Sequence, residues 1–195
     1  MPPAANDVSP LPAWQLRRAA RWLRQGGVVA YPTEAVFGLG CDPHNEAALR
    51  QLLALKQRSW RKGLILIADD TAQLTSYLQP QAESVQMRAK ASWPGPTTWL
   101  WPAQAQVSPL LRGTYPTLAV RIPAHPAARA LCRAFGHALV STSANRSGQH
   151  PARSAFEVRR KLGAHTPILI LHGGVNRRAR PSQIIDLLSG QAVRS

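Results

Sequence analysis

The stretch LKQRSWRKG places four cationic side chains close together, at Lys56, Arg58, Arg61 and Lys62. Such a run could be an exposed charged segment, a nucleic-acid-binding patch, part of a nucleophile motif or a site for phosphate. Ser59 and Lys62 match S-x-x-K, the nucleophile pattern of penicillin-recognising enzymes, but the K-T-G element of that pattern is absent from the chain. The nucleophile interpretation is therefore disfavoured, and the other three predict different residues elsewhere in the chain.

Three polar segments follow predicted strands: PTEAVFGLG, VRIPAHP and STSANRSG. Ligands collect at strand ends in α/β sheets. The third segment offers the most hydroxyl and amide groups for phosphate or ribose oxygens, from Ser141, Thr142, Ser143, Asn145 and Ser147. Arg121, at the end of another strand, has the planar guanidinium that binds a carboxylate through two hydrogen bonds, whereas lysine meets phosphate as a mobile point charge. Together these groups predict a site for a nucleotide triphosphate with a small carboxylate beside it.

Familiar catalytic motifs are missing from the sequence. There is no G-x-x-x-x-G-K-[ST] phosphate loop, and GLG at Gly38–Gly40 lacks the third glycine of a dinucleotide fingerprint. The nine acidic residues are scattered, and only Glu34 lies in a conspicuous loop after a predicted strand, which disfavours hydrolysis by paired carboxylates. Cys41 and Cys132 have no C-x-x-C or histidine-rich neighbour, so the sequence predicts neither a metal site nor a disulfide framework.

The composition indicates a folded, basic protein. With 195 residues, of which 45% are hydrophobic and 17% charged, the chain has the composition of globular domains and not of disordered ones. Lys and Arg number 24 against 9 Asp and Glu, a formal net charge of +15. Such a field attracts RNA, phosphates and other anions, although a compositional bias toward arginine explains it equally well. The N-terminus lacks the pattern of a signal peptide, and no apolar run reaches the roughly 18 residues of a membrane span, so we expect a cytoplasmic protein without membrane association.

Apolar periodicity predicts helices that alternate with short strands. The helix PAWQLRRAARWLRQ ends at Gly26–Gly27, and VVAYPT is a strand that ends at Pro32. NEAALRQLLALKQR is a helix with Asn45 as its N-cap and with Lys56 and Arg58 in its last turn. The alternation continues along the chain and predicts an α/β fold, with a twisted, mixed and partly parallel sheet and flanking helices.

No internal repeat or low-complexity linker interrupts this pattern. We therefore expect a single domain at residues 12–190, preceded by a flexible, proline-rich N-terminus at residues 1–11.

Several motifs occur in the order seen in one known family: YPTEAVFGLGCDP, the K-x-R of Lys56 and Arg58 with KGLILIA after it, WPGPTT, LAVRIPAHP, STSANRSG and PSQIID. From about Val28 to Asp186, the chain resembles the YrdC-like family of threonylcarbamoyl-AMP synthases, and we expect the short bacterial TsaC type. The resemblance implies the YrdC-like fold with a basic concave cleft. It also implies synthesis of threonylcarbamoyl-AMP and pyrophosphate from L-threonine, bicarbonate and ATP, toward threonylcarbamoyl-adenosine in tRNA.

The resemblance further implies which side chains bind the substrates. Thr33, Arg121 and Ser141 match positions that bind threonine, with Arg121 suited to its carboxylate. Lys56 and Arg58 match the catalytic positions at the triphosphate. The nucleotide-binding positions are matched by Lys56, Arg58, Lys62, Thr117, Ser143, Asn145 and Ser182. ATP is expected to bring Mg²⁺ that is held mainly by phosphates and water, and a separate tRNA-modifying transferase complex is expected to receive the product.

The chain departs from the family pattern at two places. Ser59 and Trp60 stand where relatives carry proline and its neighbour, and the strand LILIA contains no histidine. Histidine-dependent threonine contacts therefore cannot be carried over to this chain. Two alternatives remain: an RNA-binding or ribosome-maturation module that uses the basic cleft, and a YrdC-like paralogue with altered activity. Steep salt dependence of binding would indicate the RNA module, and dependence on threonine and bicarbonate would indicate the synthase.

Overall fold

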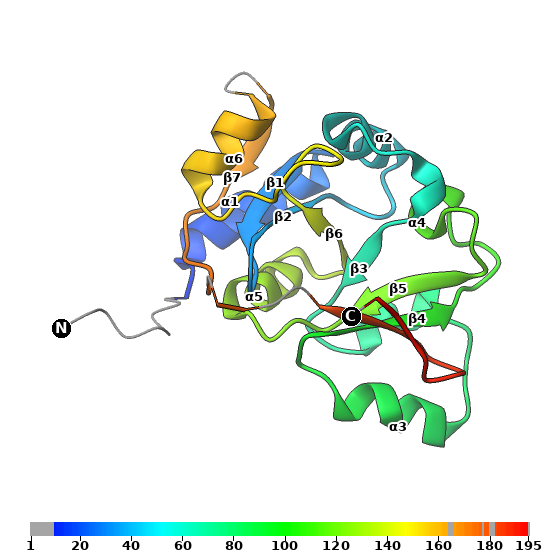
Figure 1. The fold of residues 1–195 in the computed structure, drawn as a ribbon. Coiled ribbons are helices and arrows are strands. Elements are labelled where there is room, and N and C mark those ends of the chain that lie inside the picture. Colours follow the sequence, from blue (N-terminus) through cyan, green and yellow to red (C-terminus); the bar gives the residue numbers. More distant parts are fainter. Residues whose placement is uncertain (1–9, 164–165, 177, 180–181, 195) are drawn as a thin grey trace.

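The computed structural model describes residues 10–163, 166–176, 178–179 and 182–194, and within these ranges nine strands form one sheet. The strands are β1 (Val28–Pro32), β2 (Phe37–Gly40), β3 (Ile65–Ile67), β4 (Thr97–Pro102), β5 (Thr117–Arg121), β6 (Leu139–Ser143), β7 (Ile168–Ile170), β8 (Gln183–Asp186) and β9 (Ala192–Arg194). Their order across the sheet is β7-β1-β2-β6-β3-β5-β4-β8-β9 (Figure 1).

Helices pack on this sheet, as the alternating pattern predicts. They are α1 (Ala13–Arg24), α2 (Glu46–Lys56), α3 (Glu83–Ala91), α4 (Pro109–Arg112), α5 (Pro126–Phe135) and α6 (Ala155–Leu162), with the short 3-10 helices η1 (Trp60–Lys62) and η2 (Ala72–Tyr77). None of these described helices is long and apolar enough to cross a membrane. The predicted α/β class is confirmed.

The sheet mixes parallel and antiparallel neighbours, as predicted. Parallel pairs join β1 to β7, β3 to β5 and β4 to β8, whereas β6 runs antiparallel to both β2 and β3. Because β5 and β6 therefore run in opposite directions, their carboxyl ends do not share one edge of the sheet. The side chains of these two strands are therefore brought together on a shared face of the sheet and not at a shared edge.

Helix α2 carries the first cation of the LKQRSWRKG stretch at its last residue. Asn45 caps the helix as predicted, because its Oδ1 accepts the N–H of Ala48 at 3.0 Å. The helix ends at Lys56, since Gln57 adopts a left-handed conformation with φ 50°. The prediction that both cations lie in the last turn is thus right for Lys56 and wrong for Arg58, which lies beyond the helix.

Two segments that the sequence predicts to be loops contain strand. FGLG forms β2, antiparallel to β1, and β6 continues to Ser143 instead of ending near Val140. Glycine has a low intrinsic preference for strands, so FGLG gives no strand pattern in the sequence. Pairing with β1 and β6 supplies the stability that local propensity lacks.

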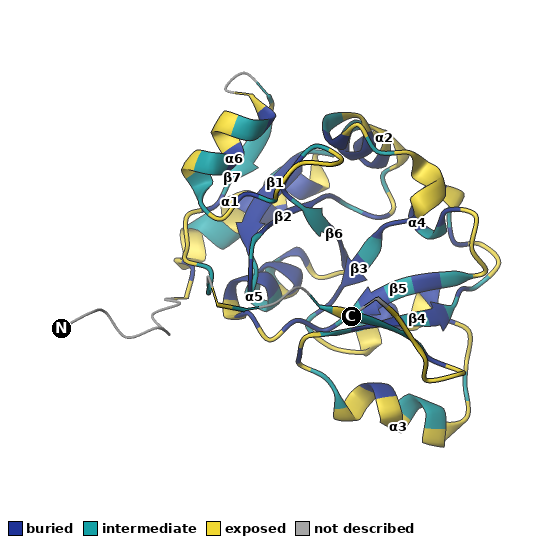
Figure 2. Cartoon of the chain, in the orientation of Figure 1, coloured by how far each residue is buried: buried dark blue, intermediate teal, exposed yellow. Residues whose placement is uncertain are grey.

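Buried residues line the central strands and the helix sides that face them (Figure 2), and apolar side chains pack on both faces of the sheet. Leu66, Val120 and Val140 belong to a larger cluster that includes residues of α2 and α6. Ile67 and Leu139 belong to a second cluster with residues of α1 and α5. Because successive side chains of a strand point to opposite faces, the sheet separates two apolar cores, and helices cover part of each face.

The predicted limits of the domain, 12–190, stay a prediction. Most of the predicted N-terminal segment, 1–11, lies outside the described residues. Within them, Leu11 is 6% exposed and packs in the second cluster. At the other end, β9 lies beyond the predicted limit and pairs with β8.

Candidate functional site

Predicted site residues from β5 and β6 point to one face of the sheet. Ile65 of β3 pairs with Ser141 of β6 on one side and with Ala119 of β5 on the other. Ile67, two residues further along β3, pairs with Arg121 of β5. Side chains two residues apart on a strand share a face. The face defined in this way, called the ligand face below, carries Thr117, Arg121, Ser141 and Ser143. Two residues predicted to bind threonine therefore lie on the same surface as two predicted to bind nucleotide.

Lys56 is buried, with 2% exposure, and its ammonium holds the segment that follows β6. Nζ donates to the carbonyl of Asn145 at 2.9 Å, to Asn145 Oδ1 at 3.3 Å and to the carbonyl of Ser143. The hydroxyl of Ser143 donates to the same Oδ1 at 2.6 Å. Burial, followed by the charge of Arg58, lowers the pKa of Lys56 to about 8. The structure thus joins Lys56, Ser143 and Asn145 in one hydrogen-bonded group.

The other three cations of the stretch lie in the loop after α2. Arg58 is half-buried, and its Nη2 donates to the carbonyl of Gly63 at 3.0 Å. Arg61 and Lys62 are exposed in η1, whose first turn Ser59 caps by accepting the N–H of Arg61 at 3.4 Å. Ser59 therefore acts as a loop-capping residue. Among the described contacts, none joins Lys62 to the ligand face.

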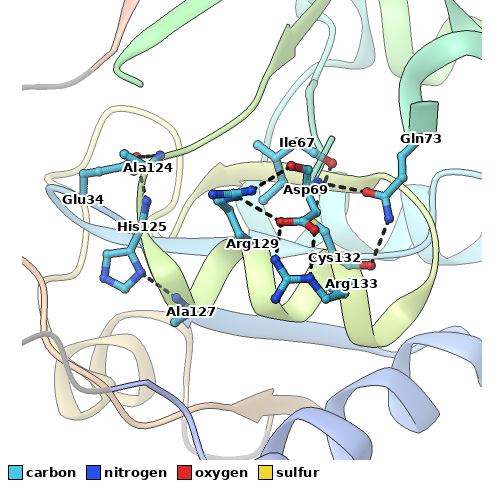
Figure 3. A network of polar contacts seen from close by, with 10 residues as sticks. All are labelled: Glu34, Ile67, Asp69, Gln73, Ala124, His125, Ala127, Arg129, Cys132 and Arg133. Atoms are coloured by element: carbon cyan, nitrogen blue, oxygen red, sulfur yellow. Dashed lines mark hydrogen bonds and ion pairs between the residues drawn. The ribbon is translucent and has the colours of Figure 1, made fainter. Parts of the chain in front are cut away.

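Arg121 forms an ion pair that sequence reasoning missed. Its Nη2 lies 2.6 Å from Glu34 Oε1, with side chains only 13% and 20% exposed, and its Nε donates to the carbonyl of Gly95 at 2.8 Å. Glu34 Oε1 also accepts the N–H groups of Ala124 and His125 (Figure 3). The loop after β1 is thereby fastened to the loop after β5. The only sequence signal was the place of Glu34 in that first loop.

Thr33 and Ser182 have hydroxyl groups that already make contacts within the protein. Thr33 Oγ1 donates to the carbonyl of Val36 at 2.6 Å and closes the turn between β1 and β2. Ser182 Oγ accepts from Thr98 Oγ1 of β4 at 3.1 Å. Thr33 lies next to Glu34 and so close to the Arg121 end of the site, while Ser182 is tied to β4.

A second residue that sequence reasoning missed is Tyr31. It is fully buried, and its phenol oxygen lies 2.8 Å from Ser141 Oγ. Its position directly before PTE was the only signal. The residue thus connects β1 to the ligand face at Ser141.

An ionic network around Asp69 joins the end of β3 to α5 (Figure 3). Asp69 accepts from Arg129 Nε at 2.9 Å and from Arg133 Nε and Nη2 at 2.9 Å each. The side chain of Asp69 is 11% exposed, and Gln73 Oε1 accepts its backbone N–H at 2.9 Å. We interpret this network as structural, because both carboxylate oxygens of Asp69 already accept from the two arginines.

Comparisons with known proteins cover nearly the whole chain. Residues 21–195 match the model of the Sua5/YciO/YrdC family, which is described as "Telomere recombination". A threonylcarbamoyl-AMP synthase of Nitrosococcus oceani is 56% identical over 183 residues, 94% of this chain and 98% of that protein. The structure of P. abyssi Sua5 complexed with L-threonine has a TM-score of 0.83 at 32% identity, over 91% of this chain and 52% of that one. The structure of E. coli YciO has a TM-score of 0.82 at 26% identity, over 96% of this chain and 93% of that one.

Proposed function

The chain belongs to the Sua5/YciO/YrdC family, and we propose that it synthesises threonylcarbamoyl-AMP and pyrophosphate from L-threonine, bicarbonate and ATP. The observation that carries this proposal is the 56% identity, over 94% of the chain, to a protein named threonylcarbamoyl-AMP synthase. The ligand face supports it, because a guanidinium and several hydroxyl groups share one surface. The enzyme is then a nucleotidyltransferase of the tRNA-modification type.

The reaction forms two bonds in sequence. The neutral amine of threonine attacks the carbon of bicarbonate, water leaves, and a carbamate results. A carbamate oxygen then attacks the α-phosphorus of ATP, the bond from that phosphorus to its bridging oxygen breaks, and pyrophosphate departs. These steps require positioning and charge neutralisation more than covalent help from the protein. A site with hydrogen-bond donors and without paired carboxylates suits them.

Threonine is proposed to bind where the loop after β1 meets the ligand face. Arg121 is held there by Glu34 and by a backbone carbonyl, and its remaining terminal nitrogen can meet the carboxylate of the substrate. Ser141 and Thr33 would contribute hydroxyl groups from β6 and from the β1–β2 turn. The structure of a relative, P. abyssi Sua5, complexed with L-threonine supports an amino-acid site in this fold.

The nucleotide is proposed to bind beside it, over the hydrogen-bonded group at the end of β6. Ser143 and Asn145 would contact it directly, and Lys56 would act from beneath by fixing these two residues and by adding positive charge. Arg58 and Lys62 would approach the triphosphate from the loop after α2. The remaining proposed nucleotide contacts are Thr117 and Ser182.

Magnesium is proposed to enter with ATP, bound mainly to phosphate oxygens and water. Among the described residues, no group of three or more His, Cys, Asp or Glu side chains could hold a metal ion. The carboxylates of Glu34 and Asp69 are both engaged by arginine. The donor set therefore fits a metal that the substrate carries and not a resident one.

The product is a reactive adenylate, so we propose that a separate transferase complex receives it and modifies tRNA. We further propose a cytoplasmic site of action, where ATP, threonine, bicarbonate and tRNA occur together. The chain itself need not bind tRNA tightly for this transfer.

Release of pyrophosphate tests the proposed function directly. The purified protein is incubated with Mg²⁺ and ATP, and threonine or bicarbonate is omitted in turn. We expect release only when both are present. Pyrophosphate release that continues when threonine or bicarbonate is omitted would contradict the proposed synthase activity. It would favour a YrdC-like paralogue that catalyses another reaction.

The charge of +15 motivates one competing function, an RNA-binding module. Binding of this kind should weaken steeply between 50 and 200 mM salt, on the order of tenfold or more if several phosphates are contacted. Salt-sensitive RNA binding together with no threonine-dependent turnover would favour that module over the enzyme.

A further inference from the structure

Tyr31 lies on the ligand face, since it pairs with Gly38 and Gly38 pairs with Ser143, and it has no exposed surface. Its ring spans from β1 across β2 to β6, where the phenol oxygen meets Ser141 Oγ at 2.8 Å. Two glycines of β2 make room for the ring. A Cβ atom at Gly38 would lie 3.1 Å from Tyr31 Cζ, and one at Gly40 would lie 3.0 Å from Tyr31 Cε1 and 2.5 Å from the carbonyl oxygen of Val140. The FGLG segment is therefore shaped to let this phenol reach Ser141.

The direction of this hydrogen bond follows from the surroundings of the phenol. Either hydroxyl could donate to the other in principle. If Ser141 donated, the Tyr31 proton would need a different acceptor, and none is found for it among the described residues. A buried donor without an acceptor is costly. Tyr31 is therefore the donor, and burial raises the pKa of its phenol, so the proton stays in place.

Ser141 is left with one proton to give. Its oxygen accepts from Tyr31, and no acceptor for its own hydrogen is found among the residues that the structure describes. The side chain lies on the ligand face, where Ser141 pairs with Ile65 of β3 and Arg121 pairs with Ile67, two residues further along that strand. Ser141 is 9% exposed. A ligand atom that meets this hydroxyl must then be an acceptor, such as a carboxylate or carbamate oxygen.

We propose that Tyr31 is a positioning residue that sets the hydroxyl of Ser141 as a hydrogen-bond donor to an acceptor oxygen of the amino-acid substrate. The inference rests on the proposed function, because it takes threonine as the ligand beside Arg121. It adds a role for a residue that never touches the substrate. It also explains why the ring of Tyr31 lies against glycines, Gly38 and Gly40 of β2, and not against larger residues.

The test is a double-mutant cycle between Tyr31→Phe and Ser141→Ala. Tyr31→Phe removes only the phenol oxygen, and we expect the KM for L-threonine to rise about five- to tenfold with the KM for ATP within about twofold of wild type. In the Ser141→Ala background, the same substitution should change the KM for threonine by less than about twofold, because the hydroxyl it orients is gone. Pyrophosphate release and calorimetric titration with threonine both report the effect.

Tyr77→Phe is the matched control. Tyr77 is another buried tyrosine, 5% exposed, and its phenol bonds His44 Nε2 at 2.7 Å. Loss of that oxygen should leave the KM for threonine unchanged. Melting curves show whether each variant is folded at the assay temperature.

Two results would overturn the inference. One is an unchanged KM for threonine in a folded Tyr31→Phe protein. The other is an equal rise in the KM for threonine when Tyr31→Phe is introduced into the wild type and into Ser141→Ala, as expected if Tyr31 has only a structural role. Neither result touches the proposed function as long as the wild-type protein requires threonine and bicarbonate. Pyrophosphate release without threonine in the wild type would instead contradict the proposed function itself.

Discussion

Replacing Lys56 by methionine removes one ammonium group and keeps an unbranched side chain of similar size. In the folded protein this ammonium donates to the carbonyls of Ser143 and Asn145 and to the side chain of Asn145. The carbonyl of Asn145 has no second donor among the described hydrogen bonds. The substitution therefore leaves a buried acceptor without a partner and releases the segment that we propose as the nucleotide site.

Two opposing effects determine the change in folding stability. An acceptor buried without a partner costs about 1–3 kcal/mol. Burial lowers the pKa of Lys56 from 10.5 to about 8, so removing the buried charge recovers about 3 kcal/mol at 1.36 kcal/mol per pKa unit. These contributions nearly cancel. We expect the Tm of Lys56→Met to stay within about 5 °C of the wild-type value, as measured by circular dichroism.

The effect on activity should be much larger. Lys56→Met removes a positive charge from beneath the triphosphate and loosens two side chains that bind the nucleotide, so kcat/KM for ATP should fall at least about 100-fold, or about 2.7 kcal/mol. Pyrophosphate release at varied ATP measures it. Arg178→Ala, at an exposed residue, should change kcat/KM by less than about twofold. A folded Lys56→Met protein that loses less than threefold, or an equal loss in Arg178→Ala, would refute the assignment.

Four further predictions follow from the contacts of Lys56, Glu34 and Asp69. Because the pKa of Lys56 is about 8, the KM for ATP should rise between pH 7 and 9 in the wild type and stay flat in Lys56→Arg. The folded pKa lies below the unfolded one, so urea titrations should show wild-type stability increasing relative to Lys56→Met between about pH 8 and 10.5, by at most about 3 kcal/mol. Glu34→Gln should raise the KM for threonine about tenfold and leave the KM for ATP unchanged in steady-state assays, because Arg121 loses a largely buried charged partner. Asp69→Asn should lower the Tm by roughly 3–8 °C with unchanged kcat/KM, whereas Glu46→Gln, which breaks an exposed pair, should lower it by less than about 2 °C in the same melting experiment.

The sequence predicts the helices and most strands because their signals are local. The cap at Asn45 and the end of β1 at Pro32 depend on neighbouring residues only, whereas the end of α2 at Lys56 depends on the left-handed conformation of Gln57, which the sequence pattern does not indicate. Strand β2 escapes such reasoning, since FGLG has no strand preference of its own. Its place between β1 and β6 depends on a ring from β1 that fits only where side chains are absent.

Candidate site residues are predictable as a set, but their arrangement is not. Ser141, Ser143 and Asn145 stand out through their side-chain types, and Arg121 through its position after an apolar run. That β5 and β6 present these groups on one face depends on the register of β3 between them, and a shift of one residue would reverse the face. Glu34 and Tyr31 gain their roles only through partners that are distant in the sequence.

Both central cations of the site are held by protein acceptors, and this affects the two substrates differently. A side chain that is already fixed loses little conformational entropy when a ligand binds, whereas a free arginine or lysine loses up to about 2 kcal/mol. Glu34 fixes Arg121 but also offsets its charge. For a phosphate this offset weakens attraction, yet threonine arrives as a zwitterion, whose opposite charges suit a neighbouring guanidinium and carboxylate. Lys56 is fixed by neutral acceptors, and among the described contacts no carboxylate offsets its charge. The site therefore pairs a compensated cation with the amino acid and an uncompensated one with the nucleotide, which is why Glu34→Gln should affect threonine and Lys56→Met should affect ATP.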